Sequence, residues 1–434
     1  MIVLSRKYIN EIRNHKLLSF QQNINKATFA SLPGVGLMSG MAGFIFDVHS
    51  SEVFKGLVRT QLTQSLGRIT ADLSSETAVA LEEYFPPRKD WQRCVFYPTT
   101  VDLVSRLSAR VFLGEGICRN KEWLKVSGAY AVEGIEFIRV LRFWKPILRP
   151  IVQFFLSERR QMIKSERVAR RIINDELERR IVEQTEDARV GRPVRKYDDA
   201  LQWLQDWRQK SGQKFDIVGG QLGLGLGAIH TTSMALTRVL YDLIDNPEWI
   251  QPLRDEVKRV LEEDGEWKKT TLHKLKLMDS VMKESQRRSP VHLTIMTRIA
   301  EADVTFSDGL KVRKGDMLTV TTPEVMMDPE LFPEPERFIG NRFLKLRQMP
   351  GNENKWQYVT TSTEHFGFGH GEHSCPGRFF AGNELKVALA HMLLKYDWKF
   401  AQGHDSRNIE RAQDIIPNPI ANVMFKERQP ELQL

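Results

Sequence analysis

The sequence of 434 residues contains only three cysteines, Cys94, Cys118 and Cys375. So small and odd a number is not typical of a disulfide framework and favours a reducing compartment. With 41% hydrophobic and 27% charged residues, the composition excludes disordered, collagen-like and low-complexity classes. The length would allow roughly three domains or one large enzyme domain, and we expect a single domain over residues 1–434.

The sequence also has no obvious export signal or membrane anchor. Residues 1–13 show no charged segment followed by an apolar one, so no signal peptide is predicted. Two uncharged windows are long enough to test as membrane spans. Residues 27–46 contain one proline and four glycines, which favours a surface or pocket loop. Residues 217–237 are apolar on all sides but include a histidine and several hydroxyl groups, which is typical of a buried central helix.

Acidic residues are outnumbered, with 63 Lys and Arg against 55 Asp and Glu and a net charge of +8. This balance favours acidic partners or membrane surfaces. The basic residues form no compact stripe interleaved with aromatics, so nucleic acid is not predicted as a partner.

Helical patterns dominate the first 290 residues, and residues 159–186 predict a long solvent-facing helix. The clearest strand signal lies at residues 302–320, where Asp308 and Gly309 stand between two alternating segments and predict a hairpin. A final helix is predicted over residues 377–396. The sequence therefore predicts a mainly α fold with a small β part.

The segment with the strongest chemical signal is residues 368–377, Phe-Gly-His-Gly-Glu-His-Ser-Cys-Pro-Gly. Its glycines allow close backbone approach, and a helix start after Cys375 would stabilise a thiolate, which is a good ligand for iron. An inert buried cysteine is the plain alternative. Zinc is a further one, because His365, His370, His373 and Cys375 could supply four ligands. Structural zinc usually draws its ligands from two separated pairs, which disfavours that reading.

The pattern Phe368-x-x-Gly371-x-His373-x-Cys375-x-Gly377 resembles the haem-binding signature of the cytochrome P450 haem-thiolate monooxygenases. Residues 376–381 are similar to those of fungal members that act in secondary metabolism. The family usually has Arg where His373 stands, and a donor side chain there would still reach a haem propionate. The resemblance implies that Cys375 is the axial ligand of the iron in haem b.

Glu284-x-x-Arg287 is similar to the buried ion pair of this family, although such pairs also occur on helix surfaces. The third member of the family's network is an Arg before a Phe. Arg337 matches that motif literally, but the run at residues 328–333 fixes the frame and favours Arg342. The resemblance implies that this network holds the cysteine loop under the haem.

Residues 227–232, Gly-Ala-Ile-His-Thr-Thr, resemble the central-helix motif that faces oxygen in the family. Gly223, Gly227 and Thr231 recur every four residues and form a stripe against which a flat cofactor could lie. A dinucleotide-binding loop is disfavoured because no strand precedes these glycines. Thr231 would order water. His230 stands in place of the usual acid and could relay protons.

Two further arginines are assigned by the resemblance. Arg298, entering the first late strand, matches the family's propionate-binding Arg, with an exposed charge as the alternative. Arg59 is the second propionate partner suggested, although the Trp of the usual motif is absent.

The resemblance covers residues 1 to about 425 and implies the cytochrome P450 fold without its membrane helix and first elements. It implies O2-dependent oxidation of a hydrophobic, terpenoid-like small molecule, with electrons from NADPH through a flavoprotein reductase. A monomer at the cytoplasmic face of the endoplasmic reticulum membrane is expected.

The substrate pocket is expected to be lined by residues 32–46, 291–296, 415–421 and the central helix. The alternatives are a haem-thiolate enzyme that rearranges or dehydrates its substrate and a non-enzymatic haem sensor or inactive product.

Overall fold

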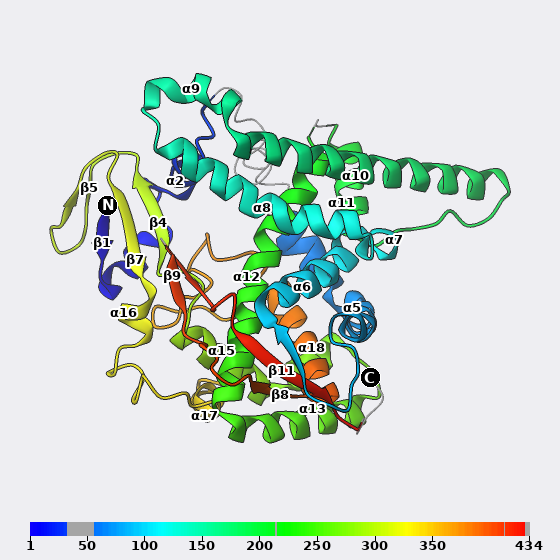
Figure 1. Cartoon of the computed structure of the whole chain (residues 1–434). Coiled ribbons are helices and arrows are strands. Elements are labelled where there is room, and N and C mark those ends of the chain that lie inside the picture. Colours follow the sequence, from blue (N-terminus) through cyan, green and yellow to red (C-terminus); the bar gives the residue numbers. More distant parts are fainter. Residues whose placement is uncertain (33–55, 213–214, 412, 430–434) are drawn as a thin grey trace. The chain divides into compact units, whose positions relative to one another are not determined.

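The computed structural model describes residues 1–32, 56–212, 215–411 and 413–429. These residues form two compact units. The first comprises Met1–Asn23, Thr63–Leu103 and Thr231–Leu434, and the second comprises Ile24–Leu62 and Val104–His230. Helices dominate and strands are few, as the sequence predicts (Figure 1). Three helices contain residues of both units: α2 (Phe20–Ala27), α6 (Phe96–Leu113) and α12 (Ile217–Asp245).

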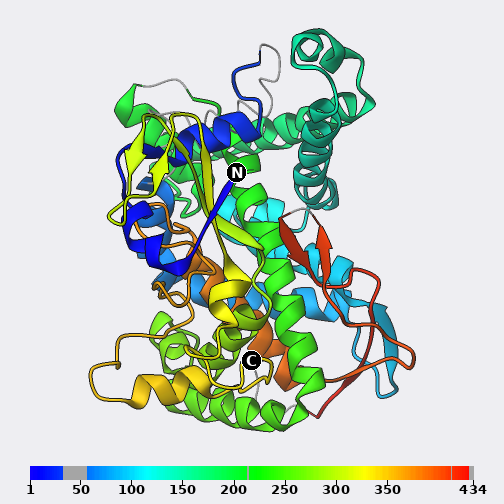
Figure 2. The same ribbon diagram turned by 90° about the vertical axis from the view of Figure 1, so that its left-hand side faces the viewer.

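The first unit contains a four-stranded sheet with the order β1-β7-β4-β2. Its strands are β1 (Ile2–Leu4), β2 (Leu18–Ser19), β4 (Thr294–Ala300) and β7 (Met317–Thr321). The strand β1 runs parallel to β7, with Ile2 opposite Leu318, so the start of the chain lies beside its last third (Figures 1 and 2). Apolar side chains of this sheet pack around Leu318 and Val320, neither of which is exposed.

The predicted hairpin is confirmed as β5 (Val304–Thr305) and β6 (Lys311–Val312), which pair antiparallel. Gly309 adopts a φ of 88°, a left-handed conformation that glycine reaches without a steric penalty. The turn is closed by the Gly309 amide, which donates to the Phe306 carbonyl at 2.9 Å.

The C-terminal part of the first unit surrounds a deeply buried helix. A three-stranded antiparallel sheet has the order β3-β11-β8. The predicted last helix is α18 (Arg378–Lys395), and every residue from Leu385 to Leu394 is buried. The remaining elements of this unit are α1 (Ile9–Ile12), α5 (Thr63–Tyr84), β3 (Gln92–Val95), α13 (Ile250–Asp264), α14 (Lys269–Lys274), α15 (Lys276–Arg288), α16 (Thr322–Met326), α17 (Arg342–Gln348), β8 (Tyr396–Phe400), β9 (Ile409–Arg411), β10 (Asp414–Ile416) and β11 (Asn422–Glu427).

The second unit is helical. Its longest pair, α8 (Lys121–Arg142) and α10 (Ser157–Arg189), pack along each other (Figure 1), and α10 is the long helix predicted over residues 159–186. Asn120 starts α8 by accepting the amides of Glu122 and Trp123 at 3.0 Å. The other helices are the π-helix Leu57–Leu62, α7 (Glu115–Cys118), the short turns Pro146–Leu148 and Gln153–Phe155 on either side of α9 (Arg149–Val152), and α11 (Ala200–Ser211).

In the part of the chain that the structure describes, no helix combines the length and the apolar character needed to cross a membrane. The apolar window at residues 217–237 forms the first part of α12, and most of it is buried, as predicted. Residues 33–46 of the expected pocket loop lie outside the described residues.

Candidate functional site: a cysteine loop over a buried ionic network

In the loop that precedes α18, Cys375 lies next to Phe368, the first residue of the loop. The Cys375 amide donates to the Phe368 carbonyl at 2.8 Å, and the Gly369 amide donates to the Phe366 carbonyl at 2.7 Å. Gly369 and Gly371 have φ values of 73° and 84°, which side chains other than glycine rarely adopt. The two glycines therefore fix the turn that presents the sulfur of Cys375.

Gly371 also lets the loop sit directly on the N-terminal segment. A Cβ at this position would lie 2.5 Å from Oδ1 of Asn14 and 3.0 Å from the Arg13 carbonyl. The same Asn14 oxygen accepts the Glu372 amide at 2.8 Å. A side chain at residue 371 would push these two segments apart.

Cys375 is half-buried, and it differs in setting from the two other cysteines. Burial raises the pKa of its thiol, while the amides of Gly377 and Arg378 and the guanidinium of Arg378 oppose that rise. A bound metal ion displaces the proton of such a thiol outright. Cys94 lies on β3, where burial raises its pKa to about 12, and Cys118 is buried at the end of α7.

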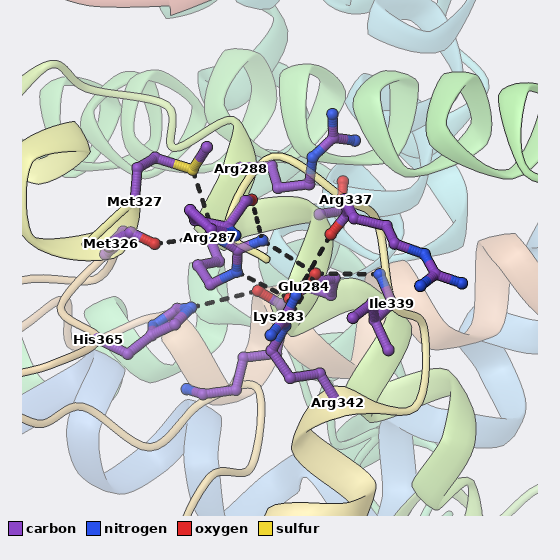
Figure 3. Close-up of polar contacts among 12 residues, drawn as sticks. Lys283, Glu284, Arg287, Arg288, Met326, Met327, Arg337, Ile339, Arg342 and His365 are labelled. Atoms are coloured by element: carbon purple, nitrogen blue, oxygen red, sulfur yellow. Dashed lines mark hydrogen bonds and ion pairs between the residues drawn. The ribbon is translucent and has the colours of Figure 1, made fainter. Parts of the chain in front are cut away.

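Beside this loop, Glu284 and Arg287 of α15 form a fully buried ion pair (Figure 3). The Glu284 carboxylate accepts Nε of Arg287 at 2.8 Å and Nη2 at 3.0 Å. Arg342, the first residue of α17, adds its Nε at 3.1 Å from both carboxylate oxygens. The Ile339 amide donates to Oε1 of Glu284 at 3.1 Å, so the buried carboxylate is surrounded by donors.

The two guanidinium groups use their other donors on backbone carbonyls. Arg287 donates to the carbonyls of Met326 at 2.9 Å and Pro335 at 2.7 Å. Arg342 donates to the Pro333 carbonyl at 2.6 Å. Arg337 is 70% exposed and pairs with exposed Glu334, so Arg342, and not the literal motif match, contacts Glu284.

Arg298 on β4 is a buried cation, only 2% exposed. Its Nη1 donates to the Thr297 carbonyl at 3.0 Å, but among the described residues its Nε has no hydrogen-bond partner and no carboxylate forms an ion pair with it. Burial lowers its pKa only to about 10, so it is positively charged at neutral pH. An unpaired buried cation is costly, and an anionic group of a ligand would satisfy it.

Two features that the sequence did not reveal orient Arg298. The register of β4 shifts between Ile295 and Arg298, and Met296 within the shift has a φ of 60°; such bulges redirect side chains. The guanidinium then lies 5.4 Å from the centre of the Phe20 ring, and that ring lies 5.2 Å from the ring of His373. Phe20 thus places His373 of the cysteine loop close to Arg298.

The residues present fit a haem-thiolate group. The half-buried Cys375 follows a glycine-rich turn. The buried guanidinium of Arg298, which has no carboxylate partner among the described residues, could pair with an acidic substituent of the macrocycle. A zinc site does not fit, because no group of three or more His, Cys, Asp or Glu among the described residues could hold a metal ion. His365 instead donates to the Lys283 carbonyl at 3.2 Å (Figure 3).

The central helix α12 carries His230 and Thr231. The ring Nε2 of His230 donates to the Gly128 carbonyl of α8 at 2.9 Å, a partner that its sequence neighbours could not indicate. Thr231 is half-buried. Arg59 lies on the π-helix Leu57–Leu62 of the second unit and is exposed.

A small pocket lies in the first unit further along α12. Val291 and Ile415, both from segments expected to line the substrate pocket, lie on its wall. Other lining side chains are Met234, Ala235, Val239, Met282, Tyr358 and Pro417, with Arg238, Ser285, Gln286, Ser289 and Asn408 as the polar part.

Comparisons with known proteins identify the family of the chain. A family model described as Cytochrome P450 matches residues 110–426. Cytochrome P450 monooxygenase 1 of Gibberella fujikuroi is 38% identical over 432 residues, covering 100% of this chain and 96% of that protein. Cytochrome P450 monooxygenase hepE of Aspergillus oryzae is 39% identical over 431 residues, covering 99% of this chain and 77% of that protein.

Among solved structures, the retinoic-acid-bound cyanobacterial CYP120A1 aligns with a TM-score of 0.68 at 19% identity. The alignment covers 98% of this chain and 89% of that one, and it confirms the predicted fold. The relatives match over nearly the whole chain at more than a third identity. The chain therefore belongs to the cytochrome P450 family of haem-thiolate monooxygenases.

Proposed function

We propose that this chain oxidises C–H bonds of a hydrophobic, terpenoid-like secondary metabolite with O2, using electrons that a flavoprotein reductase passes on from NADPH. The observation that carries the proposal is the position of Cys375 on a glycine turn beside the buried Glu284–Arg287–Arg342 network. Fungal monooxygenases among the relatives support it.

Haem b is the proposed prosthetic group, with the Cys375 sulfur as the axial ligand of its iron. Arg298 and His373, and Arg59 as a further partner, would bind the propionates. Phe368, Gly371 and Gly377 shape the loop that carries the sulfur. The Glu284–Arg287–Arg342 network would hold this loop in place through the segments whose carbonyls it binds. When bound, a thiolate-ligated haem supplies O2 activation, because the thiolate donates electron density that favours O–O cleavage.

Proton supply is assigned to α12. The Thr231 hydroxyl would order a water molecule, and His230 would pass a proton towards it. Because a carbonyl only accepts, Nε2 of His230 carries the proton in its bond to Gly128, which leaves Nδ1 as an acceptor in the neutral ring. The same bond supports the alternative that His230 only joins α12 to α8.

The apolar residues around the pocket support the proposed substrate class. Aliphatic and thioether groups of Val291, Ile415 and Met234 stand on its wall, and apolar walls favour a ligand with little polar surface. Arg238 is engaged by Asp242 at the same place, so its charge is already balanced.

The proposed location is the cytoplasmic face of the endoplasmic reticulum membrane, with the chain acting as a monomer and a single domain. An exposed apolar surface on the second unit supports membrane contact. Between Arg139 and Ser157 there is no acidic residue, whereas Arg142, Lys145 and Arg149 are basic. A surface that combines aromatic, aliphatic and basic groups fits the interface of an anionic bilayer. Its exposed apolar members are Phe143, Trp144, Ile147, Leu148, Ile151, Phe154 and Phe155.

The decisive experiment is a reduced carbon-monoxide difference spectrum of the purified chain, followed by turnover with NADPH and a reductase. A thiolate-type spectrum with NADPH-dependent product supports the proposal. A thiolate-type spectrum with product formed without NADPH would instead indicate a rearranging or dehydrating enzyme. Haem binding without a thiolate-type band, or without any turnover, would favour a sensor or an inactive chain.

A further inference from the structure

Helix α15 buries a second acid, Asp279, in addition to Glu284. Asp279 is 6% exposed. Its Oδ1 lies 2.6 Å from Nζ of Lys386 on α18, and its Oδ2 lies 3.5 Å from Nη1 of Arg347 on α17. Burial is the largest single influence and opposes ionisation of this carboxyl, but Lys386, the Tyr358 amide and Arg347 together lower its pKa. Asp279 therefore carries a charge that is balanced by two cations from two other helices.

Asp279 also binds the backbone of a turn at residues 357–360. Its Oδ2 accepts the Tyr358 amide at 2.8 Å. Lys283, one helical turn further along α15, donates Nζ to the carbonyls of Gln357 and Thr360, both at 2.9 Å. The turn is closed internally by the Thr360 amide, which donates to the Gln357 carbonyl at 2.9 Å. A carboxylate and an amine of one helix thus bind both ends of this turn; burial lowers the pKa of the Lys283 amine to about 7, and its two hydrogen bonds to carbonyls do not depend on its charge.

The turn at residues 357–360 contacts the cysteine loop. The Tyr358 ring lies 5.2 Å from the Phe368 ring at an angle of 82°. Arg378 donates Nε to the Val359 carbonyl at 3.1 Å and Nη1 to the Cys375 carbonyl at 2.9 Å. A continuous path of charge-assisted hydrogen bonds and ring packing therefore leads from Asp279 to Cys375.

The turn packs closely against α18. A Cβ on Gly382 of α18 would lie 2.9 Å from Cγ1 of Val359, so the turn rests on the helix backbone itself. Tyr358 is only 2% exposed. Movement of the turn would displace Arg378 and the ring of Phe368 together, and both contact the loop that carries the sulfur.

We propose that Asp279 is a positioning residue for Cys375. With Lys386 and Arg347 it forms a second buried ionic network, separate from that of Glu284. Together with the hydrogen bonds of Lys283, this network fixes the turn at residues 357–360 against the cysteine loop. The proposal rests on the assignment of Cys375 as the haem ligand. The network would keep the Cys375 sulfur in the position required of a haem ligand.

The test uses the holoenzyme and its Asp279→Asn variant with two readouts. The first is hydrogen exchange of the turn amides, followed by mass spectrometry. We expect exchange of the peptide with Tyr358 to rise about tenfold or more, as the loss of one charge-assisted hydrogen bond would produce. The second readout is the fraction of haem that keeps thiolate ligation in the reduced carbon-monoxide spectrum. Each protein is measured at the same number of degrees below its own melting temperature. We expect that fraction to fall.

Arg254→Met is the matched control, because Arg254 is also buried and charged in the first unit but binds the carbonyls of Leu393 and Tyr396 and the carboxylate of Asp397. It should lower the melting temperature without changing either readout.

If Asp279→Asn does not fold, Lys283→Met loosens the same turn without leaving an unpaired acid, and the same two changes are expected. Unchanged exchange and ligation in the folded variant would overturn the proposal. If the wild-type chain never shows thiolate ligation, the assignment of Cys375 has failed, whereas the exchange result still reports on the turn.

Discussion

Nε of Arg342 lies 3.1 Å from both carboxylate oxygens of Glu284, although the two residues stand on different helices and are at most 8% exposed. Buried charges are tolerated when they are paired and hydrogen-bonded. This contact joins α17 to α15, and the backbone carbonyls of residues 333–337 that Arg342 also binds are fixed with it.

Replacing Arg342 by Ala should cost about 3–5 kcal/mol of folding free energy, because Glu284 loses one of its two cations while it stays buried. Arg337→Ala should cost less than about 1 kcal/mol, since its pair with Glu334 is exposed. Denaturant titration of both variants measures the difference, and haem content should follow the same order. Equal losses in the two variants would contradict this assignment.

Replacing Cys375 by Ala should abolish the thiolate-type carbon-monoxide spectrum, because neither of the two other cysteines lies in a glycine-rich loop that leads into a helix. Cys94→Ala and Cys118→Ala should keep it, since these thiols lie on β3 and at the end of α7. The spectra are recorded on purified, folded protein. A thiolate band that persists in Cys375→Ala would remove the proposed ligand.

Replacing His230 by Ala should leave haem binding and reduction intact. If the ring relays protons, product formed per NADPH consumed should fall and peroxide release should rise. Thr231→Ala is the companion variant, because its hydroxyl is proposed to order the water. Unchanged coupling in His230→Ala, with loss of coupling in Thr231→Ala, would reduce His230 to its hydrogen bond with Gly128.

The stability of the first unit should fall as the pH drops from about 6.5 towards 3. His391 of α18 is fully buried, and burial lowers its pKa to about 3, so below its unfolded pKa of about 6.5 the unfolded chain binds the proton and the folded chain does not. His391→Gln should remove up to about 1.4 kcal/mol of this loss per pH unit. Denaturant midpoints at pH 7 and pH 5 provide the test. An identical pH dependence in the variant and the wild type would show that other groups cause the loss.

The exposed apolar surface should bind lipid vesicles. Phe143, Ile147 and Phe155 are 80%, 83% and 76% exposed, and their joint replacement by Ser should weaken sedimentation with phosphatidylserine-containing vesicles at least about tenfold, since each apolar side chain contributes about 1.5–3 kcal/mol when it leaves water. The matched control is Ile181→Ser with Val182→Ser on α10, which are 55% and 67% exposed. Loss of self-association instead of vesicle binding would identify the surface as a contact between copies of the chain.

Local patterns in the sequence were sufficient to predict some features of the fold. The Asp308-Gly309 hairpin and the helix after Cys375 depend on turn chemistry and periodicity within a few residues, and both are present. The frame around residues 328–333 selected Arg342, which does contact Glu284. These predictions needed only neighbouring residues and their order along the chain.

Other features depend on contacts that no local pattern encodes. Asp279 reads as one charge on a helix until α18 supplies Lys386 from more than a hundred residues later. The register shift in β4 could not be predicted, because the residue with positive φ is Met296 and not a glycine. The Gly128 partner of His230 and the place of Phe20 beside Arg298 likewise arise from tertiary packing.

The parallel pairing of β1 with β7 has a consequence for the timing of synthesis. Leu318 is synthesised more than 300 residues after its partner Ile2. At about 5–20 residues per second this delay is on the order of half a minute. Asn14, which supports the cysteine loop, waits longer still for Glu372. The pairing of β1 with β7 therefore cannot form before residue 318 has been made, and the support of the cysteine loop by Asn14 cannot form before residue 372.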